Sequence, residues 1–257
     1  KLLLKEEISF FYADLKPING IEEKYIPLNI FEANDFMNLD TDFSLVINLT
    51  GQVTTPTKLC FQQNTKGIQN IINFVKQNKI NFIQTSTLSV YGSSVNEINE
   101  NSELNPETPY GTCKAIAEYL TQKELPVDQH SIIRISNLYG DNQNKGILSY
   151  LLRSIKKNES VFFDNNGSLK RYFLNVVDAA NVITLMIKDF NSGIYNYPGN
   201  DVYDIKKLIY LIEQIINRSI NVCYENREPY DNIFKLNSTK IDSTFDYTPK
   251  HTLKDWL

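Results

Sequence analysis

The stretch FIQTSTLSVYG, Phe82–Gly92, is followed after a polar segment by PYGTCK, Pro109–Lys114. The first stretch begins as an apolar strand and ends in hydroxyl side chains and a glycine turn. The second begins a helix, in which residues four apart, such as Tyr110 and Lys114, lie on the same face. This order predicts that Thr87, Tyr110 and Lys114 meet at the end of one sheet strand.

Apolar strands and amphipathic helices alternate around this centre. The expected strands are Ile8–Asp14, Ser44–Gly51, Ile80–Ser86 and Ser131–Asn137. Between the second and third strands, the i, i+3, i+4, i+7 pattern of a helix face occurs at Ile68, Ile71, Ile72 and Val75. The alternation predicts an α/β fold, a doubly wound parallel sheet with helices on both faces. Ligands of such sheets bind beyond the carboxyl ends of the strands, where Gly51, Thr87 and Asn137 stand.

The pattern is looser after Gly140. Three helices and two short strands are expected there, at Ile147–Lys157, Val177–Asp189, Ile205–Asn217, Val161–Phe163 and Ile194–Tyr197. No linker rich in Pro, Gly or Ser divides the chain. We therefore expect a sheet domain over residues 1–140 and mainly a smaller α/β lobe over residues 141–257, with Val177–Tyr197 returning to the sheet.

The composition argues against several classes of protein. The chain has 257 residues, a net charge of −4 and a pI near 5.4, whereas a nucleic-acid surface needs a basic face. No apolar run reaches the roughly 20 residues that span a bilayer, so no membrane partner is expected. Cys60, Cys113 and Cys223 are odd in number and widely spaced, which favours reduced thiols in the cytoplasm. Neither of the two histidines pairs with a cysteine at ligand spacing, so no metal site is expected.

The pairing of Tyr110 with Lys114 indicates proton transfer beside a redox cofactor. A tyrosine phenol has a pKa of about 10, and a lysine ammonium on the same helix face stabilises the phenolate and lowers that pKa. A hydroxyl such as that of Thr87 can hydrogen-bond the substrate oxygen whose proton moves. These groups suit the interconversion of an alcohol and a ketone when a hydride acceptor is bound alongside.

Two other pairs show the same spacing, Tyr12 with Lys16 and Tyr203 with Lys207. Tyr12 stands at a strand end before a proline, and no hydroxyl-bearing strand end comes just before Tyr203. Only Tyr110 combines the helix, the preceding strand and the hydroxyl. A solvated helix start is the alternative interpretation of the Tyr110 pair.

A series of stretches follows in a specific order: VINLTGQV, NTKGIQNII, TSTLSVYG, PYGTCKAIAE, RISNLYG, GSLKRYFLNVVDAA, YNYPGN and NREPYDN. Together they cover nearly the whole chain and resemble the extended short-chain dehydrogenase/reductases, in particular the NAD-dependent epimerase/dehydratase group that acts on nucleotide sugars. The resemblance implies a Rossmann-like domain with a smaller substrate lobe. It also implies a nucleotide-sugar substrate and NAD as the cofactor, with NADP less favoured.

The resemblance implies roles for individual residues. Tyr110 is the implied base, Lys114 also holds the nicotinamide ribose, and Thr87 positions the sugar hydroxyl. The implied cofactor contacts are Asp14, Asn29, Leu49, Thr50, Gly51, Asn64, Thr85, Tyr110 and Lys114. The implied substrate contacts are Thr87, Asn137, Arg171 and Arg227, of which the arginines pair with phosphate oxygens. Alternatively, Asn137 caps the next element, Arg171 makes a surface ion pair, and Arg227 is only solvated.

One departure from the family pattern concerns the cofactor loop. None of the ten glycines forms the Gly-x-x-Gly-x-x-Gly turn that holds the cofactor pyrophosphate at a helix N-terminus. The opening KLLLKEEISFFYAD instead resembles the end of the helix after that turn and then the second strand. A parallel sheet without its central first strand has unpaired edges, so we expect about 20–25 further native residues before Lys1. Loss of cofactor binding is the alternative.

A second departure concerns the reaction. Nucleotide-sugar 4,6-dehydratases of the family place Asp-Glu directly after the catalytic threonine, and sugar decarboxylases place an acid there, whereas this chain has Leu88 and Ser89. The resemblance therefore implies an NAD-dependent epimerase that acts by hydride transfer through a keto-sugar intermediate. A nucleotide-sugar 4-keto reductase is one alternative. A non-catalytic dinucleotide-binding sensor on the same fold is the alternative from another class.

Asp14 and two helices carry the remaining expectations. A carboxylate at the end of its strand accepts hydrogen bonds from adenosine ribose hydroxyls and repels a 2′-phosphate, so Asp14 favours NAD and thereby epimerisation; a turn-forming acid is the alternative.

The helices expected over Pro56–Asn78 and Pro109–Lys123 carry apolar residues on more than one face, including Ile116 and Leu120. The family pairs these helices across a two-fold axis, so we expect a homodimer; an intramolecular core is the alternative.

Overall fold

A four-stranded parallel sheet forms the centre of the computed structural model, which describes residues 2–51, 54–141 and 143–257. The strand order is β10-β6-β4-β3. The strands are β3 (Leu45–Asn48), β4 (Asn81–Thr87), β6 (His130–Ile135) and β10 (Gly193–Tyr197). The predicted α/β fold with a parallel sheet is thus confirmed. Gln52 and Val53 of the stretch VINLTGQV lie outside the described residues.

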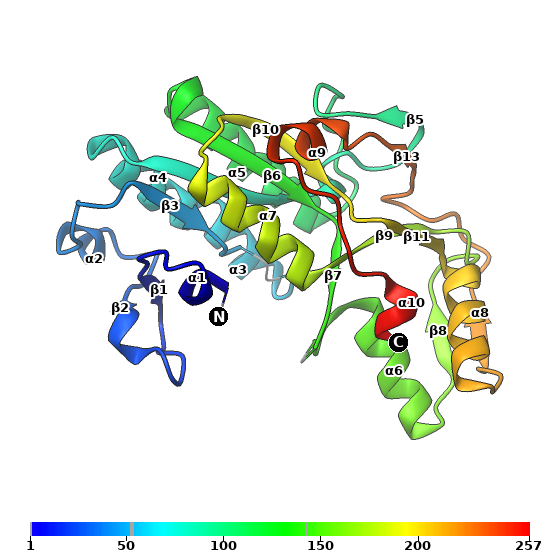
Figure 1. The fold of residues 1–257 in the computed structure, drawn as a ribbon. Helices are drawn as coiled ribbons and strands as arrows, with labels where there is room; N and C mark the ends of the chain where they lie inside the picture. The colour runs from blue at the N-terminus through cyan, green and yellow to red at the C-terminus, as the bar shows by residue number, and fades with distance from the viewer. Residues whose placement is uncertain (1, 52–53, 142) are drawn as a thin grey trace.

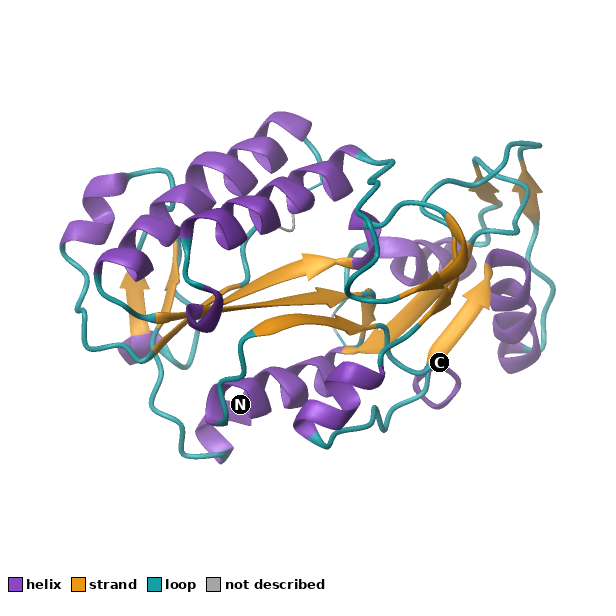
Figure 2. Cartoon of the chain, turned by 90° about the horizontal axis from the view of Figure 1, so that it is seen from above, coloured by secondary structure: helices purple, strands orange, loops and turns teal. Residues whose placement is uncertain are grey.

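Helices cover both faces of this sheet (Figure 2). One layer consists of α3 (Thr57–Gln62), α4 (Ile68–Gln77) and α5 (Pro109–Glu124). The other contains α7 (Val176–Lys188), against which α1 (Leu2–Lys5) and α9 (Thr239–Phe245) pack. A short helix, α2 (Ala33–Met37), contacts α4.

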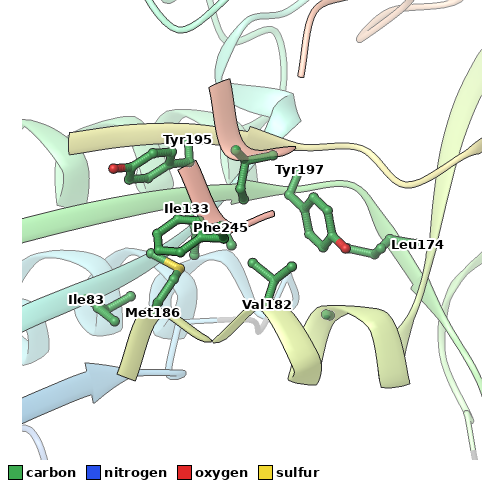
Figure 3. Packing of buried hydrophobic residues seen from close by; sticks show 10 residues of the cluster. Ile83, Ile133, Leu174, Val182, Met186, Tyr195, Tyr197 and Phe245 are labelled. Carbon is green, nitrogen blue, oxygen red and sulfur yellow. The ribbon is translucent and has the colours of Figure 1, made fainter. Parts of the chain in front are cut away.

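The central strands are buried on both faces because the sheet lies between these layers. Phe82 of β4 packs in a cluster with Ile72 of α4 and Ala117 of α5. The next residue, Ile83, packs on the opposite face with Val182 of α7 (Figure 3). Successive side chains of a strand point to opposite faces, and each buried side chain of this size contributes about 1.5–3 kcal/mol. This explains why β4 carries two successive apolar side chains, Phe82 and Ile83, one for each face of the sheet.

β1 (Tyr12–Asp14) and β2 (Tyr25–Pro27) pair in parallel as a separate two-stranded sheet. Within the described ranges, neither strand is hydrogen-bonded to the main sheet (Figure 1). The strand expected over Ile8–Asp14 is shorter than predicted, because only Tyr12–Asp14 forms a strand. Three single-turn 3₁₀ segments complete this half of the chain, at Glu22–Lys24, Leu88–Val90 and Val127–Gln129.

The second half of the chain, together with β5 from the first half, builds a lobe beyond the carboxyl ends of the main strands. A three-stranded sheet of order β11-β9-β7 contains β7 (Asn137–Tyr139), β9 (Lys170–Asn175) and β11 (Asp201–Asp204). Two strand pairs join β8 (Val161–Phe163) to β12 (Val222–Tyr224) and β5 (Ser94–Ile98) to β13 (Ile233–Leu236). The helices are α6 (Gly146–Lys157), α8 (Ile205–Ile216) and α10 (Leu253–Trp256). Their core includes Leu148, Phe173 and Leu208.

The expected helices and strands after Gly140 lie within one residue of α6, α7, α8, β8 and β10 at either end. The strand predicted over Ser131–Asn137, however, is wrong at its end. It stops at Ile135, and Asn137 begins β7 in the other sheet. The chain turns because Ser136 donates its N–H to the Tyr197 carbonyl at 3.3 Å and its hydroxyl to the Pro198 carbonyl at 2.7 Å.

The helix predicted over Pro56–Asn78 is interrupted by a π-helical turn, Gln63–Gly67. Asn64 Nδ2 donates to the Cys60 carbonyl at 2.9 Å, and Thr65 Oγ1 donates to the Phe61 carbonyl at 2.7 Å. Both side chains bind the carbonyl four residues earlier, where they compete with the helical backbone. Such turns are frequent at functional sites, and this one carries Asn64 to the end of β3.

Among the described residues, no helix has both the length and the apolar character needed to cross a membrane.

Candidate active site

A cleft of about 350 Å³ lies beyond the carboxyl ends of β4 and β6. Thr87, Tyr110, Asn137 and Arg171 all line it, although they come from four elements, β4, α5, β7 and β9. The structure thus brings together these four residues that the sequence singled out. It does so because the carboxyl ends of parallel strands share one edge of the sheet.

The position of Tyr110 is set by the start of α5. Thr108 caps this helix, and its Oγ1 accepts the Gly111 N–H at 3.1 Å. Pro109 occupies the first helical position, where its missing N–H has no cost. Tyr110 therefore stands in the first turn beside the cleft, and Lys114 follows one turn deeper.

Lys114 is fully buried behind the cleft. Its Nζ donates to the carbonyls of Thr50 at 3.1 Å and Thr85 at 3.0 Å, which ties the loop after β3 to the end of β4. Burial lowers the pKa of Lys114 to about 8, while the charges of Cys60 and Glu118 oppose this decrease. The ammonium therefore remains mostly protonated at pH 7 but is close to its titration range.

The phenol of Tyr110 differs from the sequence-based expectation. Burial raises its pKa, and the neighbouring Cys60 sulfur adds to the rise. The prediction that Lys114 lowers this pKa is therefore wrong for the chain alone, because desolvation dominates and the ammonium is hydrogen-bonded to two backbone carbonyls. Burial therefore favours the protonated phenol in this structure.

Thr87 ends β4 and shapes the turn that follows. Its Oγ1 accepts the Ser89 N–H at 3.3 Å, which caps the 3₁₀ turn Leu88–Val90. Leu88 is 6% exposed and packs with Val90 and Tyr91, while Ser89 lines the cleft. The two positions after Thr87 thus place an apolar side chain and a hydroxyl at the site.

Four of the predicted cofactor residues form one connected group at the end of β3. Thr85 Oγ1 donates to the Asn48 carbonyl at 2.7 Å, and the Thr50 N–H donates to Asn48 Oδ1 at 3.0 Å. Gly51 has a φ of 75°, and a Cβ there would lie 2.6 Å from Oδ1 of Asn64. Only glycine combines this backbone conformation with such a close neighbour.

The other predicted cofactor residues are less buried. Asp14 is exposed at the end of β1, and its Oδ1 accepts the Leu15 N–H at 2.6 Å. Asn29 follows β2 and accepts the Phe31 N–H at 3.1 Å, and Leu49 is 60% exposed. Because Asp14 and Asn29 do not line the cleft, their contacts with an adenosine remain predictions.

The predicted substrate residues divide into two groups. Asn137 Nδ2 donates to the Tyr172 carbonyl at 3.0 Å, and an Arg171 nitrogen donates to the Asp231 carbonyl at 2.8 Å, so both line the cleft in fixed positions. Arg227 instead forms an ion pair with Glu225 at 3.5 Å and does not line the cleft. A phosphate contact of Arg227 remains a prediction.

Sequence reasoning missed Asp231, a carboxyl group that also lines the cleft. Asp231 is 7% exposed, its Oδ2 accepts the Thr108 hydroxyl at 3.3 Å, and its N–H donates to Glu107 at 2.6 Å. Burial raises the pKa of its carboxyl, an effect that the charge of Arg171 opposes. The available signal was the Asp-Asn pair at residues 231–232, which is typical of turns with positive φ, and φ here is 55°.

Metal ligands do not gather at this or another site: the described ranges contain no group of three or more His, Cys, Asp or Glu side chains able to hold an ion.

The family can be assigned from the sequence. The profile of the NAD dependent epimerase/dehydratase family matches residues 23–197, which is more than half of the chain. The chain belongs to this family. All of β3, β4, β6 and α5, and therefore Thr87, Tyr110 and Lys114, lie within the matched region of this epimerase/dehydratase chain.

Known relatives of the chain catalyse more than one reaction. It is 25% identical to N-acetyl-alpha-D-glucosaminyl-diphospho-ditrans,octacis-undecaprenol 4-epimerase of Escherichia coli O157:H7, over 84% of this chain and 65% of the relative. It is 31% identical to dTDP-D-glucose 4,6-dehydratase of Homo sapiens, over 62% of this chain and 49% of the relative. The chain thus spans about half to two thirds of the length of these relatives.

Solved structures of two enzymes share the fold. The dTDP-glucose 4,6-dehydratase from Bacillus anthracis in complex with NAD superposes with a TM-score of 0.84 at 20% identity, covering 99% of this chain and 88% of that one. The UDP-glucuronic acid 4-epimerase from Bacillus cereus in complex with UDP-glucuronic acid and NAD gives 0.76 at 20% identity, covering 91% and 78%. At this identity the likeness establishes the fold.

Replacing Lys114 by Met should change how stability depends on pH. The folded-state pKa of Lys114, about 8, lies below the ordinary value of 10.5, so the unfolded chain binds more protons and the free energy of unfolding rises with pH in this window. Relative to Lys114→Met, the wild type should gain about 1 kcal/mol between pH 7 and 9. Urea unfolding at both pH values measures this difference. Lys123→Met on the same helix is the control. If the wild type gained as much stability relative to Lys123→Met as relative to Lys114→Met, the assignment to Lys114 would be wrong.

Proposed function

We propose that the chain is the core of an NAD-dependent nucleotide-sugar epimerase that acts through a keto-sugar intermediate. The observation that carries this proposal is the convergence of Thr87 and Tyr110 on one cleft, with the buried Lys114 behind them. Leu88 and Ser89 support epimerisation over water elimination, because neither position after Thr87 carries a carboxyl group.

The residues present fit the nicotinamide side of such a cofactor. Thr50, Gly51, Asn64 and Thr85 form a connected rim at the end of β3, and the close approach at Gly51 leaves room for backbone but no side chain. Lys114 would hold the nicotinamide ribose. When bound, NAD would supply the hydride acceptor.

Proton transfer in this proposal belongs to Tyr110. The phenolate would take the proton of a sugar hydroxyl while the hydrogen on the same carbon leaves as a hydride to the bound acceptor, so that the carbon becomes a ketone. After the keto sugar has turned, the hydride would return to the opposite face of that carbon, and the phenol would return the proton to its oxygen. Thr87 hydrogen-bonds the reacting oxygen, and Arg171 holds the diphosphate of the substrate.

Water elimination is the second candidate, because the structure places the carboxyl group of Asp231 in the same cleft. Burial raises the pKa of this carboxyl and favours its protonated, proton-donating form. Relatives that catalyse elimination are known, as the human dTDP-D-glucose 4,6-dehydratase shows. In that case the carboxyl group of Asp231, on a loop of the lobe, would act in place of the carboxyl groups that 4,6-dehydratases carry directly after the catalytic threonine.

The test supplies NAD with UDP-, dTDP-, GDP- and CDP-sugars and with one lipid diphosphosugar, and follows the products by proton NMR. Epimerisation gives a mixture of two sugars with no net consumption of cofactor. A 6-deoxy-4-keto product would identify elimination, which Asp231→Asn should then abolish. Turnover only with added NADPH would identify a reductase. Cofactor binding without turnover of any sugar would favour the sensor.

We further propose a homodimer in the cytoplasm. Phe61 of α3 and Tyr119 of α5 are 51% and 63% exposed on adjacent helices, and these exposed aromatic side chains support a subunit contact at this face. Cys60, Cys113 and Cys223 are free thiols, as expected in a reducing compartment.

Light scattering at micromolar concentration should therefore give twice the mass of one chain. Tyr119→Asp should shift the protein to the mass of a monomer, because it places a charge in a buried apolar contact. Tyr210→Asp is the matched control, since Tyr210 is equally exposed, at 63%, on the distant helix α8. A wild type with the mass of one chain would refute the dimer.

A further inference from the structure

A row of ionisable side chains, buried beyond its first member, extends from the candidate site along α5. Tyr110, Lys114 and Glu118 are spaced four residues apart, so they lie on one face of the helix. Arg134 of β6 faces Glu118 from the sheet. The exposed fractions are 0% for Lys114 and Glu118 and 2% for Arg134. The protein interior therefore contains three neighbouring charges that alternate in sign, those of Lys114, Glu118 and Arg134.

Glu118 is held at both of its carboxylate oxygens. Arg134 Nε donates to Oε1 at 3.0 Å, and a terminal nitrogen of the same guanidinium donates to Oε2 at 2.6 Å. The hydroxyl of Ser86 also donates to Oε1. Because Ser86 directly precedes Thr87, the carboxylate is connected to the end of β4 as well as to its own helix.

Arg134 is fixed on its other side by the buried Tyr91, which is itself bonded to Asn196. Its second terminal nitrogen donates to the Tyr91 hydroxyl at 2.6 Å, and the guanidinium carbon lies 4.8 Å from the centre of the Tyr91 ring. Tyr91 in turn donates to Oδ1 of Asn196 in β10 at 2.7 Å. The network therefore joins α5 to three strands of the main sheet.

Stability alone is a weak reason for such a pair. A buried ion pair contributes little net stability, because desolvation offsets the attraction, and an apolar pair of similar size is often at least as stable. A specific consequence does follow for Lys114. Two neighbouring titratable groups oppose the effect of burial on its charge, first Cys60 of α3 and then Glu118 of its own helix, which is the carboxylate of the two.

We propose that Glu118 is a positioning residue of the candidate active site, which keeps the buried Lys114 protonated and fixes the end of β4 through Ser86. This inference rests on the proposed function, in which Lys114 holds the nicotinamide ribose and Tyr110 transfers the proton. Arg134 serves by holding Glu118 in place through both of its carboxylate oxygens. The row thus links Arg134 through Glu118 to the face of α5 that carries Lys114.

The test measures the titration of Lys114 in the chain without added cofactor. Lysine side chains are labelled with ¹³C, the Cε shift is followed by NMR against pH, and Lys114→Met assigns the signal. The wild-type midpoint is expected near 8, and Glu118→Gln should lower it by about one unit or more. Where turnover is found, the alkaline limb of kcat/KM should move to lower pH by a similar amount.

Glu124→Gln is the matched control. It makes the same change on the same helix, but Glu124 is paired with Lys76 at the surface, so the Lys114 midpoint should not move. If Glu118→Gln does not fold, the double variant Glu118→Gln/Arg134→Gln leaves no charge unpaired and should lower the midpoint in the same direction.

A purely structural role would give a lower melting temperature with an unchanged Lys114 midpoint, and that result would overturn the proposal. Failure of every sugar diphosphate to turn over would refute the proposed function instead, while the titration would still decide the role of Glu118.

Discussion

Tyr110→Phe is expected to lower turnover by about 10²–10⁴-fold, the range by which a positioned acid–base group accelerates proton transfer. Phenylalanine keeps the ring that fills the space beside the cleft and removes only the hydroxyl that moves the proton. Folding and cofactor binding should therefore remain nearly unchanged. Initial rates, thermal unfolding and NAD titration of the variant measure the three quantities.

Tyr203→Phe is the control for this prediction, because Tyr203 has the same spacing to a lysine but lies in β11, outside the cleft lining. Its turnover should match the wild type. Near wild-type turnover in Tyr110→Phe would remove the phenol from the mechanism, whereas loss of folding in that variant would show that its hydroxyl is structural.

The main sheet could be predicted because its signals are local. β4 is apolar on both faces and ends in hydroxyls, and α5 begins with a cap, a proline and a tyrosine, so both elements are evident from neighbouring letters. The same reasoning located α6, α7 and α8 from the spacing of their apolar residues.

The lobe was harder to predict because its strands are short and their partners are distant in the chain. β5 pairs with β13 more than 130 residues later, and strands of three to five residues leave little periodicity to detect. The end of β6 depends on two hydrogen bonds from Ser136 to residues 197 and 198, which no local pattern shows.

Two residues, Asp231 and Glu118, likewise depend on partners that are distant in the chain. Asp231 reaches the cleft only because the loop before β13 folds back onto the start of α5, where Glu107 and Thr108 hold it. Glu118 completes the stripe of Tyr110 and Lys114 and was detectable by spacing, but its partner Arg134 was not. The role of a charged residue depends on the neighbours that the fold places beside it, and these cannot be identified from the local sequence.

NAD should bind about tenfold to a few hundredfold more tightly than NADP, and Asp14 should account for the difference. A carboxylate within about 4 Å of a 2′-phosphate repels it, while the same carboxylate accepts hydrogen bonds from the two ribose hydroxyls of NAD. Lys16 is also exposed and would act in the opposite direction if it reached a phosphate. Competitive binding of the two cofactors to the wild type and to Asp14→Ala measures the preference, which the variant should lose.

Asp14→Asn separates recognition from a structural role of this residue. The Asp14 carboxylate accepts the N–H of Leu15 at 2.6 Å, and an asparagine oxygen can preserve that turn while removing the charge. If charge sets the preference, Asn and Ala should both relax it, and NADP should gain affinity in each. If the turn is what matters, Asn should behave like the wild type and only Ala should change. Tighter binding of NADP by the wild type would remove both the role of Asp14 and the preference for an epimerase over a reductase, because a biosynthetic reductase draws on NADPH and an epimerase needs no net reductant.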